Sequence, residues 1–517
     1  MGNSIVKTVL GLLALIIASF LIGIMAADSA KTAAMLVFGL GALFFIVAMG
    51  RKVWMCLFLL VPVCLALPPI AEIPVAYIAL SGVLFYWLVL SLLGYVKLIW
   101  RKLLWADILL VLFILLMMIS YFRNPVGLMA LTRLFNVKFD VVGGKEYVVL
   151  LFTVLSYVTY SCIPFEKERL LKVLKWFIII RLSAAFAFGL IAWRSGEGIL
   201  PTSEDDGISR PSMFITFSFL LFTLIYASSS LKNLLTSPLR LFGILFSCLL
   251  ALLSGFRSLL ASFALVAISC SIIRKEILSL LLAAFVGLFG IYALGANDSL
   301  NILPLSMQRA LCVLPGLKVA SAARLDANTS VEWRVQMWKW ALDSRTGYIK
   351  DYIWGDGFGL DVATVQRQSM ARSRGLIRSG DQNVYAQRRV WHSGFITTLS
   401  KLGICGLVLT FVVFLYGVYM MFRVNWALRG TKYASYCMFF TCTQINSFLM
   451  FYVSAGTILG FMEQFQYFAY IKVFYNIAVD EGAIVPGLRR RKYTPMLIRE
   501  DSETRMMTEG SFRREVA

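Results

Sequence analysis

The chain has little charge for its length. Of its 517 residues, only 15% are Asp, Glu, Lys or Arg, while 59% are hydrophobic and the mean hydropathy is +0.79. A soluble globular protein is about 45–50% apolar and about 25% charged. Both values depart in the direction that a lipid bilayer requires, which argues against a soluble enzyme, a disordered scaffold and a secreted disulfide-rich protein.

Metal-binding and disulfide patterns are also missing. The nine cysteines form no CxxC or Cys/His spacing, and most lie in apolar runs, where a free cysteine behaves as a small buried hydrophobe. A thiolate metal site or a disulfide framework therefore finds no support in the sequence. Histidine is nearly absent, since His392 is the only one.

Long apolar runs are what the chain has in abundance. Crossing a hydrocarbon core about 30 Å thick takes about 20 apolar helical residues, and this window predicts fourteen spans. They lie at 6–26, 32–50, 53–67, 75–95, 105–121, 147–163, 173–193, 211–228, 238–254, 258–273, 277–295, 396–422, 434–454 and 458–477. The expected fold class is an all-α polytopic membrane protein with about 14 transmembrane helices.

The basic residues orient these spans. Lys and Arg number 49 against 28 for Asp and Glu, a net charge of +21. Most basic residues of the short loops fall on alternate loops, as the positive-inside rule requires of cytoplasmic loops. Both termini are then cytoplasmic. The chain divides into helices 1–11 (1–295), a large periplasmic loop (296–391), helices 12–14 (392–480) and a basic cytoplasmic tail (481–517).

The 296–391 loop carries more basic than acidic residues. Positive charge on the outer side opposes the topological rule, so we expect an anionic partner such as lipid headgroups or a phosphate-bearing substrate. Thr329–Glu332 predicts a capping box before a helix over about 331–344, which either lies at the membrane interface or packs on the spans. The three alternate glycines of Trp354–Gly359 indicate a sharp turn or a close backbone approach, and match a phosphate cradle weakly.

His392 lies where this loop meets the next span. A lone histidine is more often structural than catalytic, but here any base working near neutral pH has few rivals. The junction is where a lipid-linked substrate would present its head group. The preceding Arg388 and Arg389 would keep the imidazole neutral and able to accept a proton.

Two further arginines are expected at the outer ends of spans. Arg257 lies in the turn between two spans, and Arg210 at the start of another. Each either snorkels at a helix end or contributes to a clamp for a diphosphate, which suits the planar fork of arginine. Glu463, near the outer end of the last span, is a candidate supporting group.

These pieces, in this order, resemble the O-antigen polymerase and O-antigen ligase superfamily of bacterial envelope glycosyltransferases. The matching segments are Leu253–Ser258 before a span, Arg334 and Trp338 followed by Trp354–Gly359, and His392–Ser393 through Leu402–Leu407. The resemblance covers about 205–425, and the first 200 residues match only in hydropathy.

The resemblance implies an enzyme of the bacterial inner membrane with its active site on the periplasmic side. Arg257, and with it Arg210, would hold the pyrophosphate of an undecaprenyl-linked glycan donor. His392 would be the base on the acceptor hydroxyl of an inverting transfer, with Arg334, Arg389 and Glu463 in support. No metal or other cofactor is expected, nor any nucleic acid. Partners would be the donor, the acceptor, membrane lipids and a chain-length regulator protein.

Three functions remain open on the sequence alone. The leading one is a polymerase that joins lipid-linked repeat units. The second is the ligase that moves the finished polymer onto lipid A–core. The third is a polysaccharide flippase or transporter, which would be expected to show inverted internal repeats and charges along a central path; the sequence shows no repeat, and its charges cluster at the outer end.

Overall fold

A computed structural model of the chain describes the structure outside the N-terminal segment, the C-terminal tail and several internal stretches. The described residues are 48–60, 75–96, 100, 104–127, 141–162, 165–195, 199–201, 209–211, 213–296, 299–343, 345, 347–363, 370, 385–386, 389–456 and 458–484.

This part of the chain is mostly helical. A long apolar run in a lipid environment has no water to bond its backbone N–H and C=O groups, and a helix bonds them within the run itself. The helices before residue 296 are η1 (Gly50–Trp54), α3 (Met55–Leu60), α4 (Val75–Leu92), α5 (Leu104–Arg123), α7 (Gly144–Cys162), α8 (Lys167–Ser195), α9 (Ile215–Ser228), α10 (Leu231–Thr236), α11 (Pro238–Leu253), α12 (Arg257–Arg274) and α13 (Ile277–Ala296). Those after it are η2 (Ser299–Ile302), α14 (Leu305–Leu311), α15 (Ser321–Leu342), α18 (Gly394–Ala427), α19 (Ala434–Met450), η3 (Phe451–Ala455) and α20 (Ile458–Asp480).

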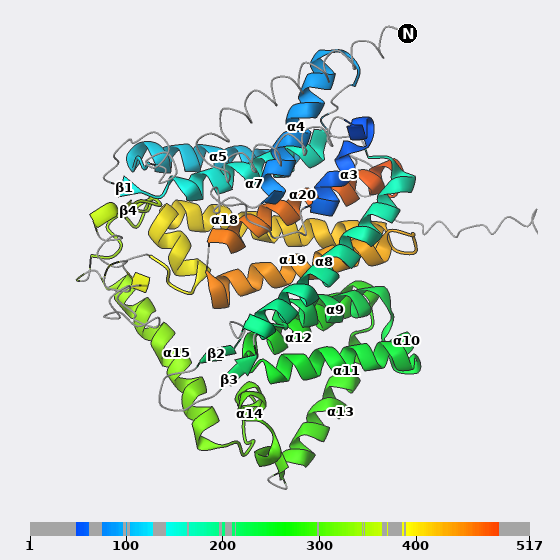
Figure 1. Ribbon diagram of the computed structural model, residues 1–517, viewed down its shortest axis with the longest axis vertical. Helices are drawn as coiled ribbons and strands as arrows, with labels where there is room; N and C mark the ends of the chain where they lie inside the picture. The colour runs from blue at the N-terminus through cyan, green and yellow to red at the C-terminus, as the bar shows by residue number, and fades with distance from the viewer. Residues whose placement is uncertain are drawn as a thin grey trace, which may run out of the picture.

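Strands are few and short in the described residues. β1 (Val141–Val142) pairs antiparallel with β4 (Leu360–Asp361), and β2 (Ile199–Pro201) pairs antiparallel with β3 (Ser209–Pro211). The first pair joins the start of α7 to the segment that follows α15, so two distant parts of the sequence meet at one end of the helix bundle (Figure 1).

Four of the described helices are long and apolar enough to cross a membrane. They are Trp105–Arg123, Lys167–Arg194, Arg257–Arg274 and Gly394–Ala427. Shorter apolar helices occupy the predicted spans at Leu80–Leu92, Glu146–Cys162, Ile215–Ser228, Pro238–Leu253 and Ile277–Ala293. The predicted spans at 6–26 and most of 32–50 lie outside the described residues, so a count of fourteen stays a prediction.

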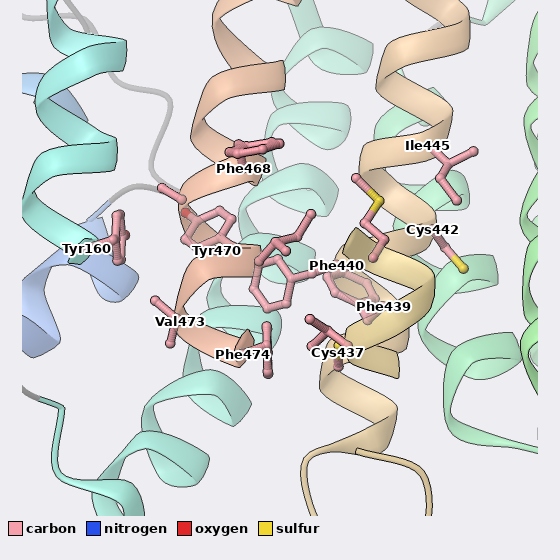
Figure 2. Close-up of a cluster of buried hydrophobic side chains, with 14 of the residues drawn as sticks. Tyr160, Cys437, Phe439, Phe440, Cys442, Ile445, Phe468, Tyr470, Val473 and Phe474 are labelled. Carbon is pink, nitrogen blue, oxygen red and sulfur yellow. The ribbon is translucent and has the colours of Figure 1, made fainter. Parts of the chain in front are cut away.

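The helices form three layers (Figure 1). α18, α19 and α20 lie in the middle, α5 and α7 pack on one side of them, and α9, α11 and α12 on the other. Aromatic side chains join the layers: Phe440 of α19 meets Tyr470 of α20 with ring centroids 4.7 Å apart, and Tyr470 meets Tyr160 of α7 at 5.2 Å (Figure 2). Such pairs add about 0.5–1.5 kcal/mol each beyond their burial.

Two buried ion pairs join the layer of α5 and α7 to the middle layer. Lys401 of α18 bonds Glu146 of α7 at 2.7 Å, and Lys472 of α20 bonds Asp107 of α5 at 3.0 Å. Tyr157 also donates to the Asp107 carboxylate, at 2.7 Å. Each lysine is nearly or fully buried, so the carboxylate offsets a desolvation cost of several kcal/mol.

α18 is interrupted at Gly403, whose φ of +66° is not helical. The backbone of residues 352–357 enters this break: the Asp356 and Gly357 amides donate to the carbonyls of Ser400 and Lys401, and the Ile404 and Cys405 amides donate to those of Tyr352 and Ile353. A Cβ on Gly403 would lie 2.1 Å from the Ile353 carbonyl oxygen. Only glycine fits here, and the loop that precedes α18 is thereby locked to it.

Candidate functional site

α15 is the element of the 296–391 segment that carries most of the site. It runs from α14 to the start of α18, across one end of the bundle (Figure 1). The predicted capping box is wrong, because the helix begins about ten residues earlier than expected, at Ser321, and Thr329 lies inside it with its hydroxyl donating to the Leu325 carbonyl. Threonine bonds a carbonyl one turn back in this way when it is mid-helix.

The sequence places Val331, Val335, Trp338 and Leu342 on one apolar stripe of the expected helix, but the buried face of α15 is a different one. Ala323, Ala327, Met337 and Ala341 are fully buried, and this spacing of four, ten and four residues defines one helix face. Val331 and Leu342, predicted on a packed or membrane-lying stripe, are 45% and 50% exposed. The face with the small residues therefore packs on the bundle.

Arg309 ties this face to the turn before α12. Its guanidinium pairs with Asp326 of α15, and its Nη1 donates to the Gly255 carbonyl at 2.5 Å. Gly255 has a φ of +68°, so the turn takes a left-handed conformation that glycine adopts at little cost. Arg309 is one of the basic residues of the 296–391 loop, and it was not predicted to belong to the site.

Arg257 begins α12 immediately after this turn. Its Nη2 donates to the Ala327 carbonyl of α15 at 2.9 Å. A guanidinium has five N–H donors, so this contact fixes the side chain beside α15 while leaving other donors for a ligand. The snorkelling alternative does not account for the contact, since the side chain reaches the loop helix.

Arg334 follows Ala327 by two helical turns on the same side of α15. Burial lowers the pKa of Arg334, and the positive charges of Arg257 and Arg309 lower it further. No carboxylate among the described residues pairs with Arg334, whereas Arg309 is neutralised by Asp326. The three arginines therefore hold an excess of positive charge in a partly dehydrated place.

His392 is held between α15 and η3, at the start of α18. The Trp338 indole donates to the Trp391 carbonyl at 2.9 Å, and the Ser393 hydroxyl donates to the Tyr452 carbonyl at 3.4 Å. Behind it, Gly456 approaches so closely that a Cβ there would lie 2.3 Å from the Ser393 carbonyl carbon. These contacts hold His392 at a φ of +49°, which non-glycine residues adopt only when their surroundings impose it.

The imidazole of His392 is enclosed by aromatic rings. Trp333 and Tyr385 lie edge-on to it, with centroids 5.3 Å and 5.0 Å away. Burial lowers the pKa of His392 below its ordinary value, and the charge of Arg334 lowers it further. Nε2 is buried and meets no hydrogen-bond partner among the residues that the structure describes.

Among the described residues, the cation that acts on His392 is Arg334 and not Arg389. Arg389 donates to the carbonyls of Asp356 and Gly357 at 3.3 Å and 3.4 Å, and its guanidinium lies 3.7 Å from the Asp356 carboxylate. It joins the His392 segment to the glycine-rich loop. Arg388 lies outside the described residues.

The glycines of Trp354–Gly359 serve close backbone approach, as predicted. Gly355 and Gly357 have φ values of +75° and +72°, and a Cβ on Gly355 would lie 2.4 Å from the Leu402 amide nitrogen. The amides of Gly355, Asp356 and Gly357 all donate to backbone carbonyls. They are therefore not free to bind a phosphate, in line with the weak match of this pattern to a phosphate cradle.

Two predicted site residues are located only by their backbone. Arg210 lies in β3, opposite Leu200 of β2, and the β2–β3 pair lies at the same end of the bundle as α15 (Figure 1). Glu463 lies in the second turn of α20. Their side chains are not among those that the structure describes.

Three predicted residues thus come together from three elements: Arg257, Arg334 and His392. The arrangement can bind an anion beside a neutral, dehydrated base. Within the described residues, no group of three His, Cys, Asp or Glu side chains is placed to hold a metal ion. Trp333 and Tyr385 could not have been found from spacing, because they are defined only by their contact with His392.

Comparison with known proteins adds no relative. No family model matches the chain, and no curated protein matches its sequence.

Proposed function

We propose that the protein is a membrane glycosyltransferase that polymerises glycan repeat units carried on a lipid pyrophosphate, at the outer face of a bacterial inner membrane. The observation that carries the proposal is that α15 contacts both Arg257 and His392. Arg257 donates to the Ala327 carbonyl of this helix, and the His392 ring, whose Nε2 is buried without a described partner, lies against Trp333 of the same helix. A diphosphate ester bound next to a base is the substrate that an arginine and a histidine placed in this way suit.

The proposed reaction uses each residue once. The guanidinium groups of Arg257 and Arg334 bind the donor diphosphate and stabilise the charge that grows on it as it leaves. A hydroxyl of the acceptor glycan attacks the anomeric carbon from the opposite face, the carbon–oxygen bond to the diphosphate breaks, and the configuration inverts. Nε2 of His392 takes the hydroxyl proton.

The 14-span topology with a periplasmic 296–391 loop belongs to this proposal. It places the start of α18, and therefore His392, at the level where a membrane-anchored donor presents its diphosphate. The same site would serve a ligase, with lipid A–core in place of a second repeat unit, so the acceptor separates the two. A flippase would need no base.

The test is transfer by the purified full-length chain in lipid nanodiscs, with undecaprenyl-pyrophosphate-linked glycans as donor and either repeat units or lipid A–core as acceptor. His392→Gln is expected to lower the transfer rate by about 100-fold or more, the usual contribution of a general base. The matched control is Gln336→Ala, an exposed position on α15. Full transfer by His392→Gln would refute the base assignment, and glycan movement across the bilayer without transfer would favour a flippase.

A further inference from the structure

Two aromatic rings and the imidazole of His392, the only histidine of the chain, form a set in which each ring contacts the other two. Trp333 and Tyr385 each lie edge-on to His392, and they also meet each other edge-on, with centroids 5.5 Å apart. Edge-to-face contacts fix ring orientation as well as burying surface. The imidazole is therefore confined in both direction and hydration by one residue of α15 and one of the segment before α18.

The enclosure leaves one nitrogen in an unusual state. A buried N–H without a partner is rarer in proteins than a buried acceptor without one, so the unpartnered Nε2 is best assigned as a lone pair. The proton of the neutral ring then lies on Nδ1. An unprotonated Nε2 that meets no donor among the described residues can accept a hydrogen bond from a ligand.

We infer that Trp333 and Tyr385 are positioning residues for His392, which keep its imidazole out of water and leave Nε2 unprotonated to accept a proton from an incoming hydroxyl. The enclosure and the tautomer concern the ring itself. Only the identity of the hydroxyl rests on the proposed function.

The charges around the ring are consistent with this role. Arg334 of α15 is the described ionisable group that acts on His392. Arg389, on the same segment as His392, is paired with Asp356. On the η3 side, the Tyr452 carbonyl and Gly456 lie against Ser393, the residue after His392, and neither carries a charge. No carboxylate among the described residues is placed to raise the histidine pKa.

Having a single histidine makes the test direct. Nuclear magnetic resonance of the full-length protein in nanodiscs, labelled with ¹⁵N-histidine, gives one imidazole titration and one tautomer without any assignment step. In the unaltered protein we expect a pKa below 6.5 and, above it, a neutral ring protonated on Nδ1. Trp333→Leu and Tyr385→Leu should each hydrate the ring and raise its pKa by about half a pH unit or more.

Two further variants serve as controls. Trp333→Phe keeps a ring at the contact and should leave the titration close to that of the unaltered protein, which also covers the case in which Trp333→Leu fails to fold. Trp340→Leu makes the same change on the same half-buried helix without a described contact to His392, and should leave the titration unchanged.

The inference would be overturned by a neutral ring protonated on Nε2, or by a histidine pKa that neither Trp333→Leu nor Tyr385→Leu moves. A shift of equal size in Trp340→Leu would overturn it too, since the effect would then belong to the helix and not to the ring contact. None of these results depends on transfer. A failed glycan assay with the expected titrations would therefore reject the proposed function and leave the enclosure standing.

Discussion

Two regions of this molecule differ in what surrounds their buried cations. Between the helix layers, Lys401 and Lys472 are 8% and 0% exposed, and each bonds a carboxylate. At the end of the bundle, Arg334 is half-buried with two further arginines acting on it and no described carboxylate partner. Lys401 and Lys472 are neutralised where they lie, whereas the charge of Arg334 has no described counter-charge, so an anionic ligand bound there would supply one.

The largest effect on stability is expected at Lys472. Asp107→Asn should leave this fully buried lysine without a carboxylate and destabilise the protein by about 3–5 kcal/mol, seen as a marked drop in Tm in a thermal size-exclusion assay. Adding Lys472→Met should restore much of the loss, because the uncompensated charge is then gone. An unchanged Tm in Asp107→Asn would show that this ion pair does not stabilise the packing of α5 on α20.

The opposite result is expected at Arg334. Arg334→Gln removes a charge that no described carboxylate neutralises, so the Tm should stay the same or rise, while glycan transfer should fall by about 100-fold. Arg324→Gln is the matched control, an exposed arginine on the same helix that donates to the Leu317 carbonyl, and should retain transfer. A lower Tm in Arg334→Gln would show that Arg334 stabilises the fold, as Lys401 and Lys472 do, and would contradict this prediction.

The smallest effect concerns pH. Since the folded-state pKa of His392 lies below its ordinary value, the unfolded chain takes up a proton first as the pH falls. The contribution of this residue is therefore complete above about pH 6.5 and is lost as the pH drops from there toward the folded pKa. The difference in Tm between pH 7.5 and pH 5.0 should be larger in the unaltered protein than in His392→Gln, and equal differences would contradict the sign.

Much of the helical framework could be predicted from the sequence, because each long apolar run must form a helix to enter a bilayer. The start of α15 could not, since Ala320 precedes it without a side-chain cap and the Thr329–Glu332 pattern inside it imitates one. Its buried face could not either, because Ala323 and Ala327 are small residues and carry little hydrophobic signal.

Some residues of the site could likewise be predicted from the sequence, and others could not. His392 and Arg257 were found by residue type and by their place at span ends, and Arg334 by its motif. The partner of Arg389 and the enclosure of His392 were not found, because Asp356, Trp333 and Tyr385 approach them only through tertiary packing. Spacing along the chain predicts which chemistry is present, and three-dimensional contact decides which group acts on which.

The break in α18 has a consequence for how the protein enters its membrane. Without residues 352–357, two carbonyls and two amides around Gly403 would have no backbone partner, and each such group costs several kcal/mol in hydrocarbon. α18 therefore cannot be accommodated as an independent helix at low cost. The preceding loop, which is synthesised first, has to return into the bundle as α18 arrives, so insertion of this span and assembly of the site are expected to be one event.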